Sequence, residues 1–206
     1  MPRIVNWYTN GSPYEAVAKI SAKTFGLAGA ESESYGIEGV GDWVQNCALK
    51  PKVCQSLLKT LKPNEGLILL DADAEVLQAF PWKVLEQNNG PYFAYVLHNR
   101  PSGAREVLSG TLWITATPEC HLLLTRWAEA CETHPNDWDQ KVLAAIIGST
   151  PPRLRGKLDE QQIAELDWHW AWLAGISDPN LEKQAYIRHN QMSRETRPIE
   201  EKKKKK

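Results

Sequence analysis

The stretch from Gly66 to Glu75 constrains the fold of this chain more than any other. It is a run of glycine and aliphatic residues that leads directly into two carboxylates, Asp71 and Asp73. A short continuous apolar run that follows turn residues predicts a buried strand, most often a parallel strand covered on both faces. In an open α/β sheet, ligands bind beyond the carboxyl ends of the strands, which is where Asp71 and Asp73 are expected.

The spacing of Asp71 and Asp73 suits a divalent cation. In extended backbone, residues i and i+2 point to the same side, so the two carboxylates can converge. Close carboxylates repel each other, and a cation removes that repulsion. Oxygen ligands favour Mg²⁺, Mn²⁺ or Ca²⁺ over Zn²⁺, and substrate phosphates often complete the shell. The stretch therefore predicts a metal–phosphate site, and the alternative is a strand that ends in a solvated acidic turn.

Composition indicates one globular domain with an acidic body. The 206 residues are enough for one well-buried domain and short for two. The formal net charge is −1, and because Lys202 to Lys206 supply five positive charges, the rest of the chain carries −6. This balance argues against a broad nucleic-acid-binding surface. The nine tryptophans are expected in the core or in pocket walls.

The sequence predicts a cytoplasmic protein. It contains neither an apolar run of membrane-spanning length nor a charged-then-apolar amino terminus. The four cysteines form no C-x-x-C pair and are expected to be reduced, buried thiols. The expected compartment is a bacterial cytoplasm, that of the host if a phage encodes the chain.

The amino-terminal residues predict a Rossmann-like βαβ unit. Residues 3–8 predict a strand, and Ser12 is expected to cap a helix that ends near Phe25. The loop with Tyr8 and Thr9 is then expected at the ligand edge of the sheet, either as a plain turn or in contact with a nucleotide.

Strands and helices are expected to alternate through the rest of the chain. The expected elements are a short strand at 33–37, helices at 43–49 and from 51, a strand at 91–97, a strand at 107–114, helices at 118–131 and 142–147, and a late strand at 186–189. Lys50 is either a solvated helix-end lysine or a point charge for a phosphate. The period-2 spacing of Trp168, Trp170 and Trp172 favours an extended segment.

Six short motifs follow one another along the chain. They are Tyr8-Thr9-x-Gly11-x-Pro13-Tyr14-Glu15, Trp43-Val44-x-Asn46-Cys47-x-x-Lys50-Pro51, Leu69-Leu70-Asp71-Ala72-Asp73-Ala74, Leu108-Ser109-Gly110-Thr111-Leu112, Trp138-Asp139-Gln140-x-Val142-Leu143 and Ile187-x-His189-x-x-x-Ser193-Arg194. In this order they resemble a small family of phage and bacterial nucleotide-sugar glycosyltransferases with the GT-A fold, distantly similar to the glycogenin-like transferases. The resemblance implies an α/β fold with a mixed, Rossmann-like sheet flanked by helices over residues 1–194. Residues 150–183 match poorly, and residues 195–206 are expected to be a charged, flexible tail.

The resemblance implies a nucleotide diphosphate sugar as donor, with a UDP-sugar expected, and a metal ion. The ion, Mn²⁺ or Mg²⁺, is expected on Asp71, Asp73 and His189, where it would stabilise the charge on the departing diphosphate. Without that context, His189 would be an ordinary core or surface histidine. The residues expected to bind the donor are Tyr8, Thr9, Asn46, Lys50, Asp71, Ala72 and Arg194.

The resemblance also implies catalytic and acceptor residues. Asp139 is expected to stabilise an oxocarbenium-like transition state, orient the acceptor or act as a base, and Gln140 to bind the sugar. The alternative for Asp139 is a helix cap. Ser109, Gly110 and Thr111 are expected to line the acceptor side. The likeness to glycogenin-like enzymes points to retention of configuration.

The acceptor stays open between a modified base in phage DNA and a glycan. The loop with Arg100 and Arg105, together with the lysine tail, could meet a phosphate backbone, which the acidic body opposes. Two other classes of function are a metal-dependent nucleotide-sugar or phosphoester hydrolase and a non-catalytic, Trp-rich binding module. The oligomeric state does not follow from the sequence.

Overall fold

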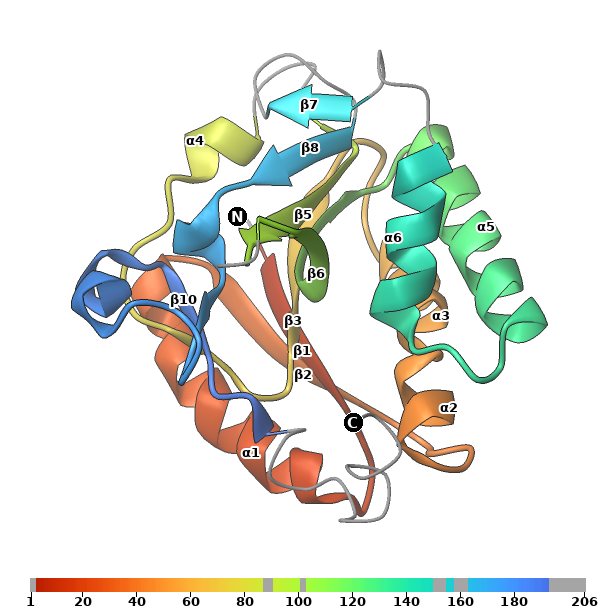
Figure 1. Ribbon diagram of the computed structural model, residues 1–206, viewed down its shortest axis with the longest axis horizontal. Helices are drawn as coiled ribbons and strands as arrows, with labels where there is room; N and C mark the ends of the chain where they lie inside the picture. Colours follow the sequence, from red (N-terminus) through yellow and green to blue (C-terminus); the bar gives the residue numbers. More distant parts are fainter. Residues whose placement is uncertain (1–2, 87–90, 101–102, 150–154, 158–162, 193–206) are drawn as a thin grey trace.

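A seven-stranded mixed sheet forms the centre of the molecule (Figure 1). The computed structural model describes residues 3–86, 91–100, 103–149, 155–157 and 163–192. The strands of the sheet are β1 (Arg3–Thr9), β2 (Glu31–Ile37), β3 (Gly66–Asp71), β5 (Phe93–Asn99), β6 (Arg105–Thr115), β7 (Arg155–Lys157) and β8 (Ile163–Leu166). They lie in the order β2-β1-β3-β6-β5-β8-β7. Strand β6 runs antiparallel to its neighbours β3 and β5, and the other pairs are parallel.

A second sheet of three short strands brings the late part of the chain to the end of β3. Its strands are β4 (Ala74–Val76), β9 (Trp172–Leu173) and β10 (Ile187–His189), in the order β4-β10-β9. Strand β10 runs antiparallel to β4, with His189 opposite Ala74. This pairing confirms the predicted late strand and places His189 beside the Asp71–Asp73 segment.

Helices cover both faces of the large sheet. They are α1 (Pro13–Ser21), α2 (Trp43–Cys47), α3 (Lys50–Leu58), α4 (Trp82–Leu85), α5 (Pro118–Thr133) and α6 (Asp139–Ser149), with 3₁₀ turns η1 (Ala22–Ala28), η3 (Trp168–Trp170) and η4 (Pro179–Gln184). Helices α2, α3, α5 and α6 lie on one side, and α1, α4 and the small sheet on the other (Figure 1). Among the described residues, no helix is both long and apolar enough to cross a membrane.

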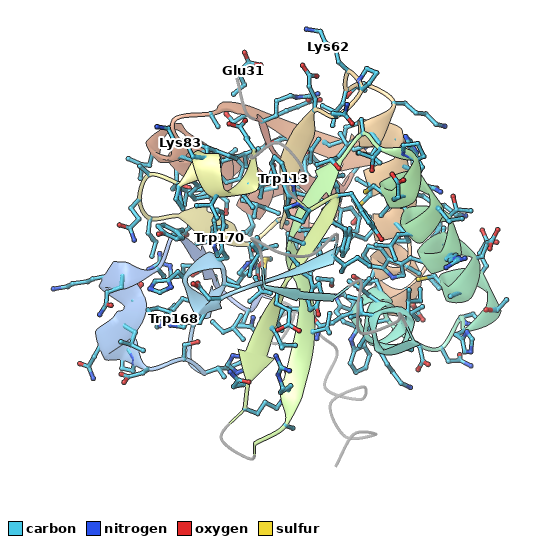
Figure 2. All side chains as sticks on the ribbon, turned by 90° about the horizontal axis from the view of Figure 1, so that it is seen from above. Glu31, Lys62, Lys83, Trp113, Trp168 and Trp170 are labelled. Atoms are coloured by element: carbon cyan, nitrogen blue, oxygen red, sulfur yellow. The ribbon has the colours of Figure 1, made fainter. Side chains whose placement is uncertain are left out.

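The apolar run of β3 is explained by two hydrophobic cores, one on each face of the sheet. Leu67 and Leu69 pack into the core under α3, α5 and α6. Ile68 and Leu70 pack into the opposite core, where Trp113 of β6 also lies (Figure 2). Since both faces of β3 are covered, successive side chains alternate between two apolar surroundings and the strand carries no polar face. The predicted buried strand is confirmed.

The first helix departs from the prediction at its end. The α-helical part stops at Ser21, and the 3₁₀ turn η1 continues past the predicted end at Phe25. The hydroxyl of Thr24 donates to the Ser21 carbonyl (2.7 Å) and accepts from the Val76 N–H (2.9 Å). These bonds tie η1 to β4 instead of extending the α-helix.

The extended segment predicted for the tryptophan repeat is only partly correct. Trp168 and Trp170 belong to the 3₁₀ turn η3, and only Trp172 lies in a strand. Asp167 starts this turn, since its carboxylate accepts a hydrogen bond from the His169 N–H (2.9 Å). Trp170 and Trp172 are buried, whereas Trp168 is half-buried and lies toward the edge of the molecule in Figure 2.

Candidate active site

A cleft of about 530 Å³ lies beyond the carboxyl ends of β1 and β3. This is the position at which open α/β sheets bind ligands. The predicted site residues that line it are Tyr8, Thr9, Asn46, Lys50, Asp71, Ala72, Asp73, Ser109, Gly110, Asp139, Gln140 and His189. Of the remaining two, Thr111 is buried beneath the cleft, and Arg194 lies outside the described residues.

Asp71, Asp73 and His189 meet above Gly110 of β6. A Cβ added to Gly110 would lie 2.9 Å from His189 Cε1, 3.2 Å from His189 Nδ1 and 3.3 Å from Asp71 Oδ2. His189 Nδ1 also lies 3.7 Å from Asp73 Oδ1. The absent side chain of Gly110 thus leaves room for His189 and Asp71, and Asp73 lies next to His189.

The tautomer of His189 follows from Thr111. The Thr111 hydroxyl donates to the Trp170 carbonyl (2.9 Å), and His189 Nε2 lies 2.9 Å from the same hydroxyl oxygen. Since that hydroxyl has one proton and it is already used, the hydrogen bond requires Nε2–H to donate. Nδ1 is then the ring nitrogen that faces the carboxylates. Thr111 was predicted on the acceptor side; its side chain is buried, and its hydroxyl orients His189.

The turn that carries Asp73 is fixed by the residues after β10. The Asp73 carboxylate accepts a hydrogen bond from the Met192 N–H (2.8 Å), and its carbonyl accepts from the Asn190 N–H (3.2 Å). Burial disfavours the charge of Asp73, but the contact with His189 and the Met192 N–H outweigh burial and lower its pKa. Asp73 is therefore a carboxylate at neutral pH.

Lys50 is buried among carboxylates, so the solvated helix-end alternative is wrong. The residue is 3% exposed, and its Nζ lies 2.8 Å from Asp71 Oδ1 and 3.0 Å from Asp139 Oδ2. It also donates to the Ser109 hydroxyl (3.0 Å) and carbonyl (3.2 Å). Burial opposes the charge of Lys50, but Asp139 and Asp71 raise its pKa, so the ammonium stays protonated.

Asp139 belongs to the site and does not merely cap a helix. Helix α6 begins at Asp139, earlier than the predicted Val142. The Asp139 side chain is buried, and its Oδ2 accepts from the Ser109 hydroxyl (2.7 Å) in addition to its ion pair with Lys50. These contacts hold the carboxylate in one position within the first turn of α6.

Gln140 continues the polar network toward the rim of the cleft. Its Nε2 donates to Glu106 Oε1 (3.0 Å), and its Oε1 lies 3.5 Å from the Ser109 N–H. Glu106 Oε2 accepts from Arg100 Nε (2.7 Å). The network therefore runs from the buried Ser109 out to the exposed Arg100.

Outside this network, predicted donor residues shape the cleft through their own contacts. The Asn46 side chain accepts from the Val40 N–H (2.9 Å) and donates to the Gly41 carbonyl (3.0 Å), so it holds the loop before α2. The Thr9 carbonyl accepts from the Ser12 hydroxyl (2.6 Å), which fixes the start of α1.

Several cleft residues were not predicted. Trp7 donates from Nε1 to Asp71 Oδ1 (3.3 Å), and Trp43 and Trp138 line the cleft with ring centroids 6.5 Å apart. Trp43 and Trp138 stand inside two of the motifs, which was a usable signal. Glu106 carries no signal in the sequence, because its role depends on the pairing of β5 with β6.

The donor set fits a divalent cation. Three carboxylates and one ammonium, from Asp71, Asp73, Asp139 and Lys50, leave an excess of carboxylates over cations beside His189 Nδ1. Burial raises the pKa of Asp71, and Asp139 and Asp73 raise it further against the pull of Lys50. Within the described part of the chain, no group of three or more His, Cys, Asp or Glu side chains is arranged to hold a metal ion by itself. An open arrangement agrees with Mg²⁺-type sites, which use one or two carboxylates and substrate phosphates.

The fold is shared with solved glycosyltransferases. The chain aligns with a glycosyltransferase involved in the glycosylation of the major capsid of PBCV-1 at a TM-score of 0.64 and 13% identity, covering 92% of this chain and 93% of that one. For the galactosyltransferase LgtC in complex with donor and acceptor sugar analogs, the TM-score is 0.55 at 11% identity, over 91% of this chain and 86% of LgtC. For the apo form of the glycosyltransferase GlyE of Streptococcus pneumoniae, it is 0.61 at 14% identity, over 91% of this chain and 54% of GlyE. No protein-family model and no curated protein matches the chain.

The chain therefore has a glycosyltransferase fold of the GT-A type. This confirms the fold that the six motifs predict, a mixed α/β sheet flanked by helices.

Proposed function

We propose that this chain is a metal-dependent glycosyltransferase that moves a sugar from a nucleotide diphosphate donor, expected to be a UDP-sugar, to an acceptor. The observation that carries the proposal is the placement of Asp71 and His189 beside Gly110, with Asp73 next to His189. These side chains come from two distant parts of the chain and meet in a cleft at the strand ends of a glycosyltransferase fold.

Asp71, Asp73 and His189 would hold Mn²⁺ or Mg²⁺. When bound, the ion would offset the charge that the diphosphate gains as it departs. Thr111 supports this role because its hydroxyl oxygen accepts the hydrogen bond from His189 Nε2–H. This leaves Nδ1 as the ring nitrogen that can bind the metal. Such a hydrogen bond to the second ring nitrogen is a common feature of histidine metal ligands.

The donor would lie between the end of β1 and the start of α6. Tyr8 and Thr9 are proposed to contact the nucleotide, and Ala72 the donor beside the metal. Arg194, predicted from the same resemblance, remains a candidate for the diphosphate. Lys50 contributes positive charge to this region but shares it with Asp71 and Asp139, so we assign it to holding those carboxylates in place.

Transfer forms a bond from the acceptor oxygen to the anomeric carbon and breaks the bond from that carbon to the diphosphate. The electron pair of the broken bond leaves with the diphosphate oxygen, whose basicity rises as it gains charge, and that oxygen takes the acceptor proton. Asp139 is held by Lys50 and Ser109, so we assign it to stabilising positive charge at the anomeric carbon and not to proton removal. Gln140 would bind the sugar. This arrangement supports retention of configuration.

We also place the reaction in a bacterial cytoplasm, that of the host if the chain is phage-encoded. Cys47, Cys54, Cys120 and Cys131 are all free thiols, which supports a reducing compartment.

A thermal-shift panel tests the proposal. The protein is titrated with UDP-, GDP-, ADP- and CDP-sugars, each with Mn²⁺ and with EDTA. A ligand at a hundredfold excess over its dissociation constant stabilises by about 2.7 kcal/mol, which corresponds to about 5–11 °C for a chain of this size. We expect one nucleotide class to stabilise the protein with Mn²⁺ and to lose that effect with EDTA.

The control variant is Asp73→Asn, which should fold but lose the metal-dependent part of the shift. No response to any nucleotide would contradict the proposal and favour the binding module. Rapid release of free sugar or sugar phosphate in the presence of every acceptor tested would instead identify a hydrolase.

A further inference from the structure

One wall of the cleft is aromatic and belongs to none of the groups assigned above. Trp43 of α2 and Trp138, just before α6, line the cleft with ring planes tilted by 55° and centroids 6.5 Å apart. Both are half-buried, so each keeps part of a large apolar surface open to the cleft. The tilt makes the two rings an open corner, which we call the tryptophan corner.

The backbone on both sides of the tryptophan corner is fixed. Asp42 and Gln45 form a capping box, in which the Asp42 carboxylate accepts from the Gln45 N–H (2.9 Å) and the Gln45 side chain accepts from the Asp42 N–H (2.9 Å). Trp138 accepts from the Lys141 N–H (3.0 Å) through its carbonyl, at the start of α6. Rigid placement lowers the entropy cost of ordering the rings around a ligand.

The tryptophan corner lies next to groups that can bind hydroxyls. Trp138 precedes Asp139 and Gln140 in the chain, and Gln140 connects through Glu106 to Arg100, all of which line the cleft. An apolar wall with a few convergent polar groups is the usual composition of a small-molecule subsite. Aromatic rings also suit flat ligands that are apolar on the face and polar at the edge.

The charges near the tryptophan corner disfavour a polyanion. Arg100 is paired with Glu106 (2.6 Å), and Arg105 with Glu165 (2.8 Å), so carboxylates already neutralise both arginines of the β5–β6 hairpin. Nucleic-acid affinity depends on cations that replace the counterions of phosphates. The excess of carboxylates in the cleft would repel further phosphates.

We propose that the tryptophan corner is the acceptor subsite and that it receives the ring of an uncharged sugar. The apolar face of the ring packs on Trp43 and Trp138, and its hydroxyls meet Gln140, Glu106 and Arg100. This rests on the proposed function, and it selects a glycan over DNA as the acceptor.

Binding to an array of neutral glycans, anionic glycans and single- and double-stranded DNA oligonucleotides tests this inference. The array is run with Mn²⁺ and with whichever nucleoside diphosphate stabilises the wild-type protein. We expect a neutral glycan to bind, and Trp43→Leu and Trp138→Leu each to weaken that binding at least tenfold. Both variants should keep the nucleotide-dependent thermal shift, which shows that they fold and that the donor site is intact.

Trp168→Leu is the matched control, because Trp168 is also half-buried but does not line the cleft. It should bind the glycan as the wild type does. Preferential binding of DNA or of anionic glycans, no glycan binding at all, or glycan binding unchanged in both leucine variants would overturn the inference. Because the nucleotide shift is measured separately, failure of the acceptor subsite is distinguishable from failure of the proposed function.

Discussion

Replacing Lys50 with methionine tests whether the buried charge network holds the cleft together. The substitution keeps a long apolar side chain but removes the ammonium that lies 2.8 Å from Asp71 and 3.0 Å from Asp139. Removing one partner of a buried ion pair costs about 3–5 kcal/mol, and this applies to the pair with Asp139, whose carboxylate stays buried, whereas the Asp71 side chain is 36% exposed and adds less. For a chain of this length, that loss lowers the melting temperature by about 6–20 °C.

The assay is denaturant unfolding of the wild type, Lys50→Met and Lys52→Met in EDTA. Lys52 lies on the same helix, but it is exposed and pairs with the exposed Glu132 (2.7 Å), so its replacement should cost less than about 1 kcal/mol. If Lys50→Met were no less stable than Lys52→Met, the network would not hold the cleft and the reasoning would be refuted.

The cost of Lys50→Met should also depend on pH. Burial raises the pKa of Asp71 in the folded protein, so the folded state binds this proton more tightly than the unfolded state. The stabilisation that the folded state gains from binding a proton on Asp71 is then complete below about pH 4. It is lost as the pH rises through the pKa that Asp71 has in the folded protein. In Lys50→Met the pKa of Asp71 in the folded protein rises further, because the ammonium that opposed this rise is gone. The free energy of unfolding should therefore fall further below that of the wild type at pH 7 than at pH 5. Mn²⁺ should restore part of the loss at pH 7.

Three further outcomes are expected. Gly110→Ala should weaken Mn²⁺ binding at least tenfold by calorimetry, because its Cβ would enter the space between the metal ligands, whereas Gly148→Ala, with nothing within 4 Å, should not. Asp73→Asn should abolish metal-dependent sugar transfer with little change in circular dichroism; retained turnover would exclude Asp73 as a ligand. Iodoacetamide at pH 8 should modify Cys47 well before Cys120, since burial raises the pKa of Cys120 to about 12; equal rates by mass spectrometry would contradict this order.

Local patterns in the sequence predicted the strands and helices well, because each depends on neighbouring residues. The β3 run and the Ser12 cap are examples, and Ser12 does accept from the Tyr14 N–H (3.2 Å). The tryptophan repeat was misjudged because period-2 spacing does not distinguish a strand from a short 3₁₀ turn that leads into a strand.

The interior of the site could be predicted only in part. The motifs identified most residues that line the cleft, but they carried no information on which side chains neutralise one another. Lys50 was expected in solvent or on a phosphate, since its burial depends on Asp71 and Asp139, which are distant in the sequence. The contacts of Thr111 could not be predicted for the same reason, because its partners come from η3 and β10.

The placement of His189 on β10 has a consequence for biosynthesis. All seven strands of the large sheet end by Leu166, but β10 spans Ile187–His189 and reaches its partner β4 across most of the chain. Domains begin to fold as the chain leaves the ribosome. The large sheet can therefore form on the nascent chain before His189, the third proposed metal ligand, has been translated. A ribosome-bound chain would reach a nearly complete fold while it still lacks one of the proposed ligands of its cation, and the proposed metal site would be complete only after β10 has been translated.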